Sequence, residues 1–179
     1  MEHEGTMLKT SIIAAGLTAL AISAAAAQTP NKPAIDKDSQ KFIGSAIQAD
    51  IAEVDAGQLA QQKGKSQAVK EFGAMMVKEH GEHKGKAAAV AAQLDVKPPT
   101  GASVAQKATY LKLKVLSGDT FDRSYAKTMV SDHEANIKEY KKREGKSDAV
   151  GSLAKETLPV LQHHLDMAQS LVSQTSAKK

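Results

Sequence analysis

The chain has 179 residues, carries a formal net charge of +4 and contains neither Cys nor Trp. Without Cys it has no disulfide scaffold, no Cys-ligated zinc site, no iron–sulfur cluster and no thiol nucleophile. Aromatic residues make up only 3% of the chain, which argues against an all-β sandwich or barrel and leaves few rings for stacking on bases. The length predicts one domain, and the Ala- and Lys-rich composition favours helices.

The N-terminal region has the pattern of a secretory signal. The basic residue Lys9 precedes an apolar run over residues 12–22, and small residues lead up to Ala27. The run is shorter than the roughly 20 apolar residues that span a bilayer. We therefore expect residues 1–27 to be a cleaved signal peptide. An uncleaved membrane anchor is the alternative.

Export has further consequences for localisation and partners. The destination is predicted to be the periplasm or the exterior, with a loose association with the envelope as an option. No second apolar stretch of spanning length follows, so no integral membrane insertion is expected after cleavage. The positive charge is spread evenly along the chain rather than gathered in a stripe, so no nucleic-acid partner is expected. The acidic Glu2 and Glu4 fit a signal poorly, which leaves Met1 and Met7 as alternative starts.

Beyond the signal, turn signals separate four long periodic segments. Residues 28–37, which contain Pro30 and Pro33, are predicted to form a flexible leader, and residues 174–179 a frayed tail. The bundle domain is expected over residues 38–173. Its four predicted long helices cover residues 38–63, 66–95, 119–144 and 147–173.

The connector between the second and third long helices, residues 96–118, is too long for a tight helix–helix turn. Residues 104–116 within it are predicted to form a short extra helix. At about 1.5 Å per helical residue, such a link can return along the length of a bundle. Two tight turns flanking one long crossover predict an all-α, ferritin-like bundle of four long helices.

Each long helix has a polar residue on or beside its inward-facing stripe near its midpoint. Helical periodicity places Glu53, His80 and His133 on these stripes and His164 at the flank of one. Four helices side by side would bring these groups to one level of the core. Buried carboxylates and imidazoles need a partner, and helix bundles build metal sites from such inward Glu and His residues.

Three interpretations of this polar layer are open. The layer could hold a transition metal such as Fe, Zn, Mn or Cu, with Glu53, His80, His133 and His164 as ligands. It could instead be a metal-free hydrogen-bond network that fixes helix register, or the histidines could be largely solvated. Among the neighbouring residues, we expect Glu79, Glu82 and His163 to face water, and Asp132 either to orient His133 or to have no role.

Several short motifs resemble those of the exported bacterial domain-of-unknown-function family 4142, across residues 41–171. The resemblance is carried by Phe121-Asp122 with Tyr125, by Asp132-His133, and by these further groups: Phe42-Ile43, Ala52-Glu53-Val54, Gly57-Gln58-Leu59-Ala60, Val69-Lys70, Met76-Val77, His80, Leu158-Pro159 and His164-Leu165. The resemblance implies a ferritin-like helical bundle that follows a signal peptide. It implies no established enzyme activity.

Two functional hypotheses follow from the residues. In the first, the polar layer holds a metal ion and serves metal handling or oxidant defence in the envelope. In the second, the protein is a non-catalytic structural or stress-related envelope protein. The chain contains no Glu-x-x-His motif of the kind that di-iron bundles carry, so the residues name no catalytic group and an enzyme is the less expected outcome.

Overall fold

The computed structural model describes Met1 and residues 37–176, and the predicted signal peptide and most of the predicted leader lie outside these residues. The described residues 37–176 belong to one compact unit, the helical bundle. Its five helices are α1 (Lys37–Lys63), α2 (Gln67–Gln93), α3 (Val104–Lys114), α4 (Gly118–Lys141) and α5 (Ala149–Ser176). The described residues contain no strand.

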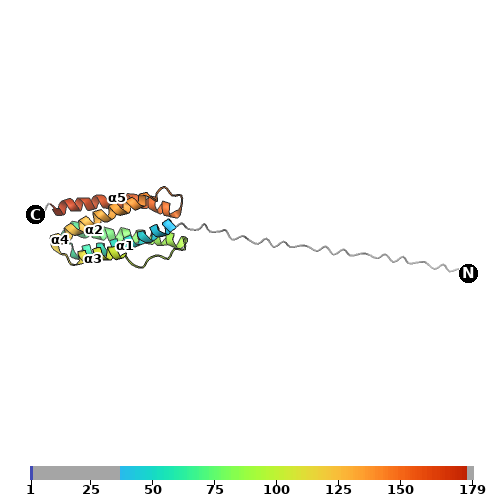
Figure 1. The fold of residues 1–179 in the computed structure, drawn as a ribbon, viewed down its shortest axis with the longest axis horizontal. Coiled ribbons are helices and arrows are strands. Elements are labelled where there is room, and N and C mark those ends of the chain that lie inside the picture. Colours follow the sequence, from blue (N-terminus) through green and yellow to red (C-terminus); the bar gives the residue numbers. More distant parts are fainter. Residues whose placement is uncertain (2–36, 177–179) are drawn as a thin grey trace. The chain divides into compact units, whose positions relative to one another are not determined.

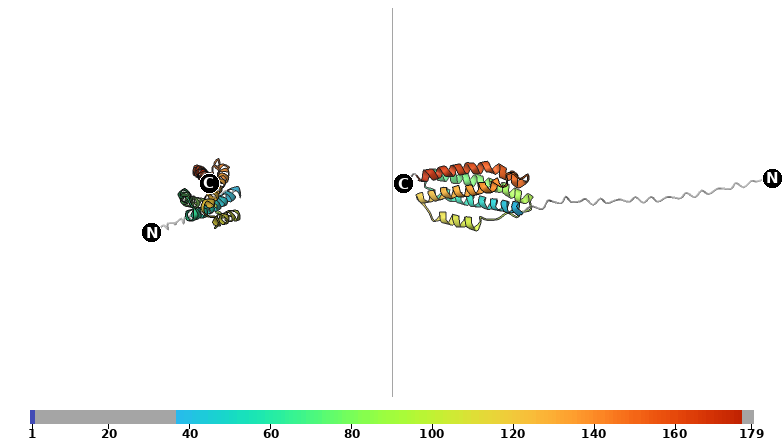
Figure 2. Two further views of the ribbon diagram at one scale, coloured as in Figure 1. Left: turned by 90° about the vertical axis from the view of Figure 1, so that its left-hand side faces the viewer. Right: turned by 45° about the horizontal axis from the view of Figure 1, so that its top comes forward.

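The architecture is the predicted ferritin-like bundle of four long helices, with α3 as the short extra helix in the crossover (Figure 1). α1 packs closely against α2, and α4 against α5. Figure 2 shows the four long helices side by side, with α3 on the outside. None of the described helices combines the length and apolar character needed to cross a bilayer.

The helix ends differ from the predicted ones by a few residues. α5 continues to Ser176, three residues past the predicted end, because Thr175 is buried and its hydroxyl donates to the Leu171 carbonyl. Ser66 caps α2, accepting a hydrogen bond from the Val69 amide. α5 also runs through Pro159 as one helix.

The crossover carries the chain back along the bundle, so α4 starts where α1 ends. Asp122, near the start of α4, accepts hydrogen bonds from the Lys65 and Ser66 amides, both at 2.8 Å, and so ties α4 to the turn between α1 and α2. The Phe121 ring stacks on Tyr125 with 5.9 Å between centroids. The Phe-Asp-x-x-Tyr motif therefore has a structural role, because it fixes the start of α4.

Three apolar clusters of described residues fill the bundle, one near the α1–α2 turn and two toward the opposite end. Phe72, Phe121 and Tyr125 belong to the cluster near the α1–α2 turn, and Phe42 and Tyr140 belong to a cluster near the opposite end. Asp50 and Glu53 on α1, His80 on α2 and His133 on α4 fall between the stretches that supply these clusters, and His164 lies on α5 beside Leu165 and Ala168, where one cluster gives way to another. The polar layer is therefore a distinct level in the middle of the bundle.

The close contact between α1 and α2 depends on two glycines. A Cβ atom built on Gly73 would lie 2.7 Å from the Gly57 carbonyl oxygen and 2.8 Å from the Ala60 Cβ. Contacts this short need backbone movement. A Cβ atom built on Gly81, on the same helix, would have no such neighbouring atom within 4 Å.

We expect Gly73→Ala to lower the free energy of unfolding by about 1–3 kcal/mol, because the added methyl overpacks the helix pair. Gly81→Ala is the matched control on α2. It should raise the free energy of unfolding by about 0.5–1 kcal/mol, since alanine is the better helix former. Urea titrations followed by circular dichroism measure both values. Equal effects of the two substitutions would contradict the packing described.

Candidate metal centre

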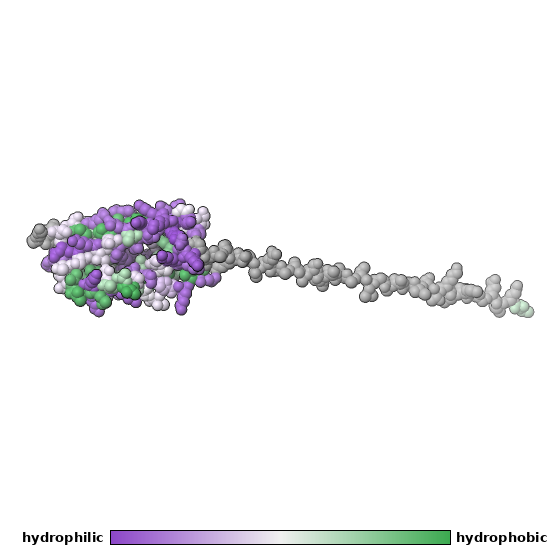
Figure 3. Space-filling view, viewed as in Figure 1, coloured by the Kyte–Doolittle hydropathy of each residue, from purple (hydrophilic) through white to green (hydrophobic). Residues whose placement is uncertain are grey.

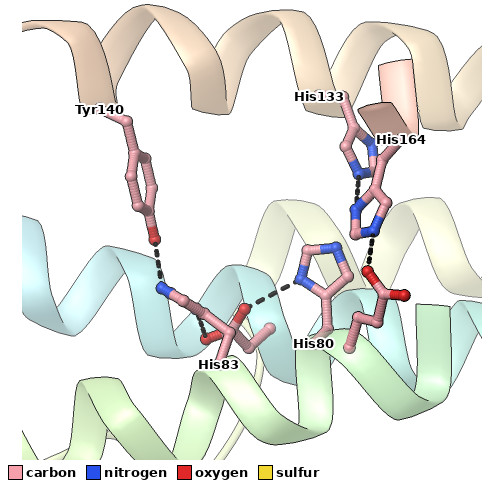
Figure 4. A network of polar contacts seen from close by, with 7 residues as sticks. His80, His83, His133, Tyr140 and His164 are labelled. Carbon is pink, nitrogen blue, oxygen red and sulfur yellow. Dashed lines mark hydrogen bonds and ion pairs between the residues drawn. The ribbon is translucent and has the colours of Figure 1, made fainter. Parts of the chain in front are cut away.

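Three buried histidines meet in the polar layer. His80 comes from α2, His133 from α4 and His164 from α5, and all three are almost fully buried. One ring nitrogen from each lies within 4.8 Å of one from each of the others. Among the described residues, this is the group of His, Asp and Glu side chains that could hold a metal ion. Figure 4 shows their rings turned toward one another.

The second nitrogen of each ring is bonded to an oxygen. His133 Nδ1 donates to the Met129 carbonyl at 2.8 Å. His164 Nε2 lies 2.8 Å from Glu79 Oε2, and His80 Nδ1 lies 2.9 Å from Asp50 Oδ1. A carboxylate accepts a proton and cannot supply one, so each of these nitrogens is the protonated one in its ring.

These bonds determine where the lone pairs of the three rings point. A neutral imidazole with a proton on one nitrogen has a lone pair on the other. That leaves lone pairs on His80 Nε2, His133 Nε2 and His164 Nδ1. The last two atoms lie 3.3 Å apart, and His80 Nε2 is buried without a hydrogen-bond partner. In their neutral forms the three rings therefore direct lone pairs into one shared space.

Burial favours the neutral forms of His133 and His164. It lowers the pKa of His133 from 6.5 to about 3, with a further decrease from the neighbouring His80 and an opposing effect of the bond to Met129. Burial also lowers the pKa of His164, although the hydrogen bond with Glu79 opposes this. Both rings are therefore poor proton acceptors at neutral pH and keep their lone pairs available.

A second branch of the network connects the group to α1 and to the end of α4. The Asp50 carboxylate accepts from His80 and also from His83 Nδ1, at 2.7 Å. His83 Nε2 then accepts from the Tyr140 hydroxyl at 3.3 Å. Burial raises the pKa of Tyr140 well above 10, and the nearby Asp50 adds to this, so the hydroxyl keeps its proton. His80 is the end of this chain that reaches the histidine group, and Asp50, itself bonded to His83, holds its ring in place.

Glu53 lies outside the histidine group. It is buried, as expected, and its Oε2 atom has no hydrogen-bond partner. Burial raises its pKa well above 4.5, and the charges of Asp132 and Asp50 raise it further. Glu53 lines a cavity of about 140 Å³ together with Asp132, against α3 and α4. The structure thus brings together three of the four residues that the sequence analysis grouped.

Other sequence expectations differ from the structure. Glu79 was expected to face water, but it is half-buried and accepts from His164. Of the two alternatives for Asp132, the structure excludes the orienting role, because His133 Nδ1 donates to a backbone carbonyl instead. Glu82 and His163 are exposed, as expected.

The sequence analysis did not identify Asp50 and Glu79 as partners of the histidines. For Asp50 a signal exists, because it continues the buried spacing of Ile43 and Ile47 along α1. Glu79 gives no such signal. It follows Lys78 and precedes His80 on the edge of the stripe, and its bond to His164 depends on how α2 and α5 are rotated against each other.

Because the pKa of Glu53 is raised in the native state, the direction in which this residue changes the free energy of unfolding with pH can be worked out. The native state retains a proton that the unfolded state releases above about pH 4.5, so stability falls as pH rises from that value toward the native pKa. Glu53→Gln keeps the shape and removes the ionisation. We expect it to raise the free energy of unfolding at pH 7 by about 1 kcal/mol or more, with little effect at pH 4.

The matched control for this prediction is Asp55→Asn on the exposed face of α1. It should change stability by less than about 0.5 kcal/mol at either pH. Urea unfolding at pH 4 and pH 7 compares the two variants with the parent. A Glu53→Gln variant that is less stable than the parent at pH 7 would show that the ionised carboxylate is bound favourably.

The comparisons with other proteins concern the fold and the family. A solved structure, a DUF305 fragment from Deinococcus radiodurans, is similar with a TM-score of 0.71 and 12% sequence identity, and the similarity covers 79% of this chain and 99% of that one. No curated protein is significantly similar in sequence. The family model described as "Domain of unknown function (DUF4142)" matches residues 24–171. The chain therefore belongs to the DUF4142 family.

Proposed function

We propose that this protein is exported and holds one transition-metal ion between His80, His133 and His164, for metal handling or oxidant defence in the envelope. The observation that carries the proposal is the convergence of three ring nitrogens, one from each histidine, whose partner nitrogens are all hydrogen-bonded to oxygens. Ligating histidines in proteins are held in this way, because the second bond fixes the tautomer and raises the basicity of the ligand.

The distance between two of the ring nitrogens fits this role. Tetrahedral zinc with Zn–N bonds of about 2.0–2.1 Å places neighbouring ligand atoms about 3.3–3.4 Å apart. His133 Nε2 and His164 Nδ1 are 3.3 Å apart. Three protein ligands also leave a fourth position open for water or another ligand.

The surrounding charge supports a divalent ion. The carboxylates of Asp50 and Glu79 each bond directly to one of the three rings, and Asp50 is buried. Two carboxylates next to a doubly charged ion would offset its charge in a site shielded from water. An all-imidazole ligand set suits zinc, copper and iron better than it suits manganese.

Metal binding is tested on the folded protein with Zn²⁺, Cu²⁺, Fe²⁺ and Mn²⁺ offered separately, followed by metal analysis. We expect one equivalent of at least one metal, lost in His164→Ala. His163→Ala is the matched control, since the neighbouring His163 is exposed, and it should bind like the parent. Circular dichroism checks that each variant is folded, and His80→Ala repeats the test on another helix.

The second candidate is a metal-free network with a structural role. It is favoured by the same 3.3 Å contact, because a single proton placed between His133 and His164 would turn the contact into a hydrogen bond. Under this alternative the parent binds no metal, and His164→Ala only lowers stability. A folded parent protein that takes up none of the four metals would contradict the metal proposal and support this alternative.

A further inference from the structure

α3 exposes an apolar face to solvent. Val104 is 86% exposed, Leu111 59% and Val115, which caps the helix, 81%. With the exposed Ala108, they fall in a stripe about 60° wide at 3.6 residues per turn. Figure 3 shows the corresponding hydrophobic patch over α3. Large apolar side chains gathered on one exposed face indicate an interaction surface.

The helix that carries this face is firmly attached to the bundle. Ser103 and Gln106 form a capping box at its start, and Leu113 on the opposite side is buried against α1 and α4. Tyr110 packs against the same apolar cluster. The orientation of α3 is therefore fixed by its inward face, and the outward apolar stripe is a stable feature of the surface.

Lysines border the apolar stripe on both sides. Lys107 and Lys114 lie along one edge and Lys112 along the other, and all three are exposed. The helix contains no acidic residue. An apolar stripe flanked by basic residues is typical of helices that lie in the interface of a membrane.

We propose that α3 docks this protein on the surface of a lipid bilayer that carries anionic headgroups. The apolar side chains of the stripe enter the boundary between headgroups and acyl chains, while the lysines stay at the level of the phosphates. A second copy of the chain fits this face less well. A twofold contact places identical surfaces together, so the lysines of the two copies would oppose one another.

Vesicle co-sedimentation tests the proposal. The protein used is residues 28–179, which contain all five helices, because the apolar run over residues 12–22 would bind lipid by itself. We expect binding to vesicles of equimolar phosphatidylglycerol and phosphatidylcholine, and much weaker binding to phosphatidylcholine alone. Replacing Lys107, Lys112 and Lys114 with Gln should lower the preference for anionic vesicles by about fivefold per lysine.

The apolar stripe is tested by replacing Val104, Leu111 and Val115 together with Gln. These side chains are exposed, so the fold should be retained, and we expect binding to fall by at least about tenfold. The matched control is Val160→Gln on α5, where the side chain is 39% exposed. It should bind like the parent.

A fluorescent reporter gives an independent readout, because the chain has no Trp of its own. The emission of the Leu111→Trp variant should shift to shorter wavelength with anionic vesicles, while that of Val160→Trp should not. Equal binding of the parent and the triple Gln variant would overturn the proposal. So would a parent that binds no vesicles and forms a dimer that the triple Gln variant does not form, since the face would then join two copies.

Discussion

In the absence of metal, His133 is expected to contribute a loss of stability as the pH falls from about 6.5 toward 3. His133 is buried and its pKa is lowered to about 3, whereas in the unfolded chain it titrates near 6.5. The unfolded state therefore binds more protons than the native state in this window, and stability falls as pH falls. For this residue alone the slope approaches about 1.4 kcal/mol per pH unit.

Other groups act in the same window and must be separated from His133. His164 has a lowered pKa and adds to the loss, whereas the raised pKa values of Glu53 and Asp132 act in the opposite direction. Urea unfolding of the parent and of His133→Gln from pH 4 to pH 7.5 isolates the effect. We expect the difference in free energy of unfolding to shrink as pH falls. A difference that stays constant would show that His133 is not held neutral.

Asp50→Asn is expected to lower the affinity for metal by about 10- to 100-fold, the usual cost of losing a residue that orients a ligand. The Asp50 carboxylate accepts hydrogen bonds from both His80 and His83. An amide offers only one oxygen acceptor, so one ring loses its bond or exchanges its tautomer. If His80 changes tautomer, its proton moves to the nitrogen that faces the other two histidines.

The matched control for this substitution is Asp55→Asn, which makes the same chemical change on the exposed side of α1. Competition titrations with a chromophoric chelator measure the affinity of each variant. Circular dichroism before each titration ensures that only folded protein is compared. An Asp50→Asn variant with the affinity of the parent would contradict the orienting role of this carboxylate.

The periodicity of the sequence predicts the fold well, because each long helix must bury one apolar stripe. Three of the four grouped residues, His80, His133 and His164, also come together as the spacing along the helices predicts. The level of each histidine along the bundle axis follows from the number of residues that separate it from the nearest turn. Both of these features depend on distances along a helix, and these can be counted directly from the sequence.

The partners of the histidines could not be predicted in the same way. Whether Glu79 turns toward His164 or toward solvent depends on a small rotation of α2, and Glu53 is buried outside the group because α1 presents Asp50 to His80 instead. A helical stripe spans more than 100°, so periodicity cannot distinguish residues at its edge. The end of α5 was missed for a related reason, since Thr175 looks polar in the sequence but is buried.

The most direct test of the central claim is nitrogen-15 NMR of the histidine side chains at pH 7, before and after one equivalent of Zn²⁺. We expect His133 and His164 to be neutral, with the proton on Nδ1 of His133 and on Nε2 of His164, and we expect Nδ1 of His80 to carry the proton that it donates to Asp50. Zinc should then shift the nitrogen of each of the three rings that faces the other two and leave exposed His163 unchanged. A doubly protonated His164 whose nitrogen signals do not respond to zinc would contradict the proposed metal site. A proton would then occupy the position between the histidines that the proposal assigns to the metal ion.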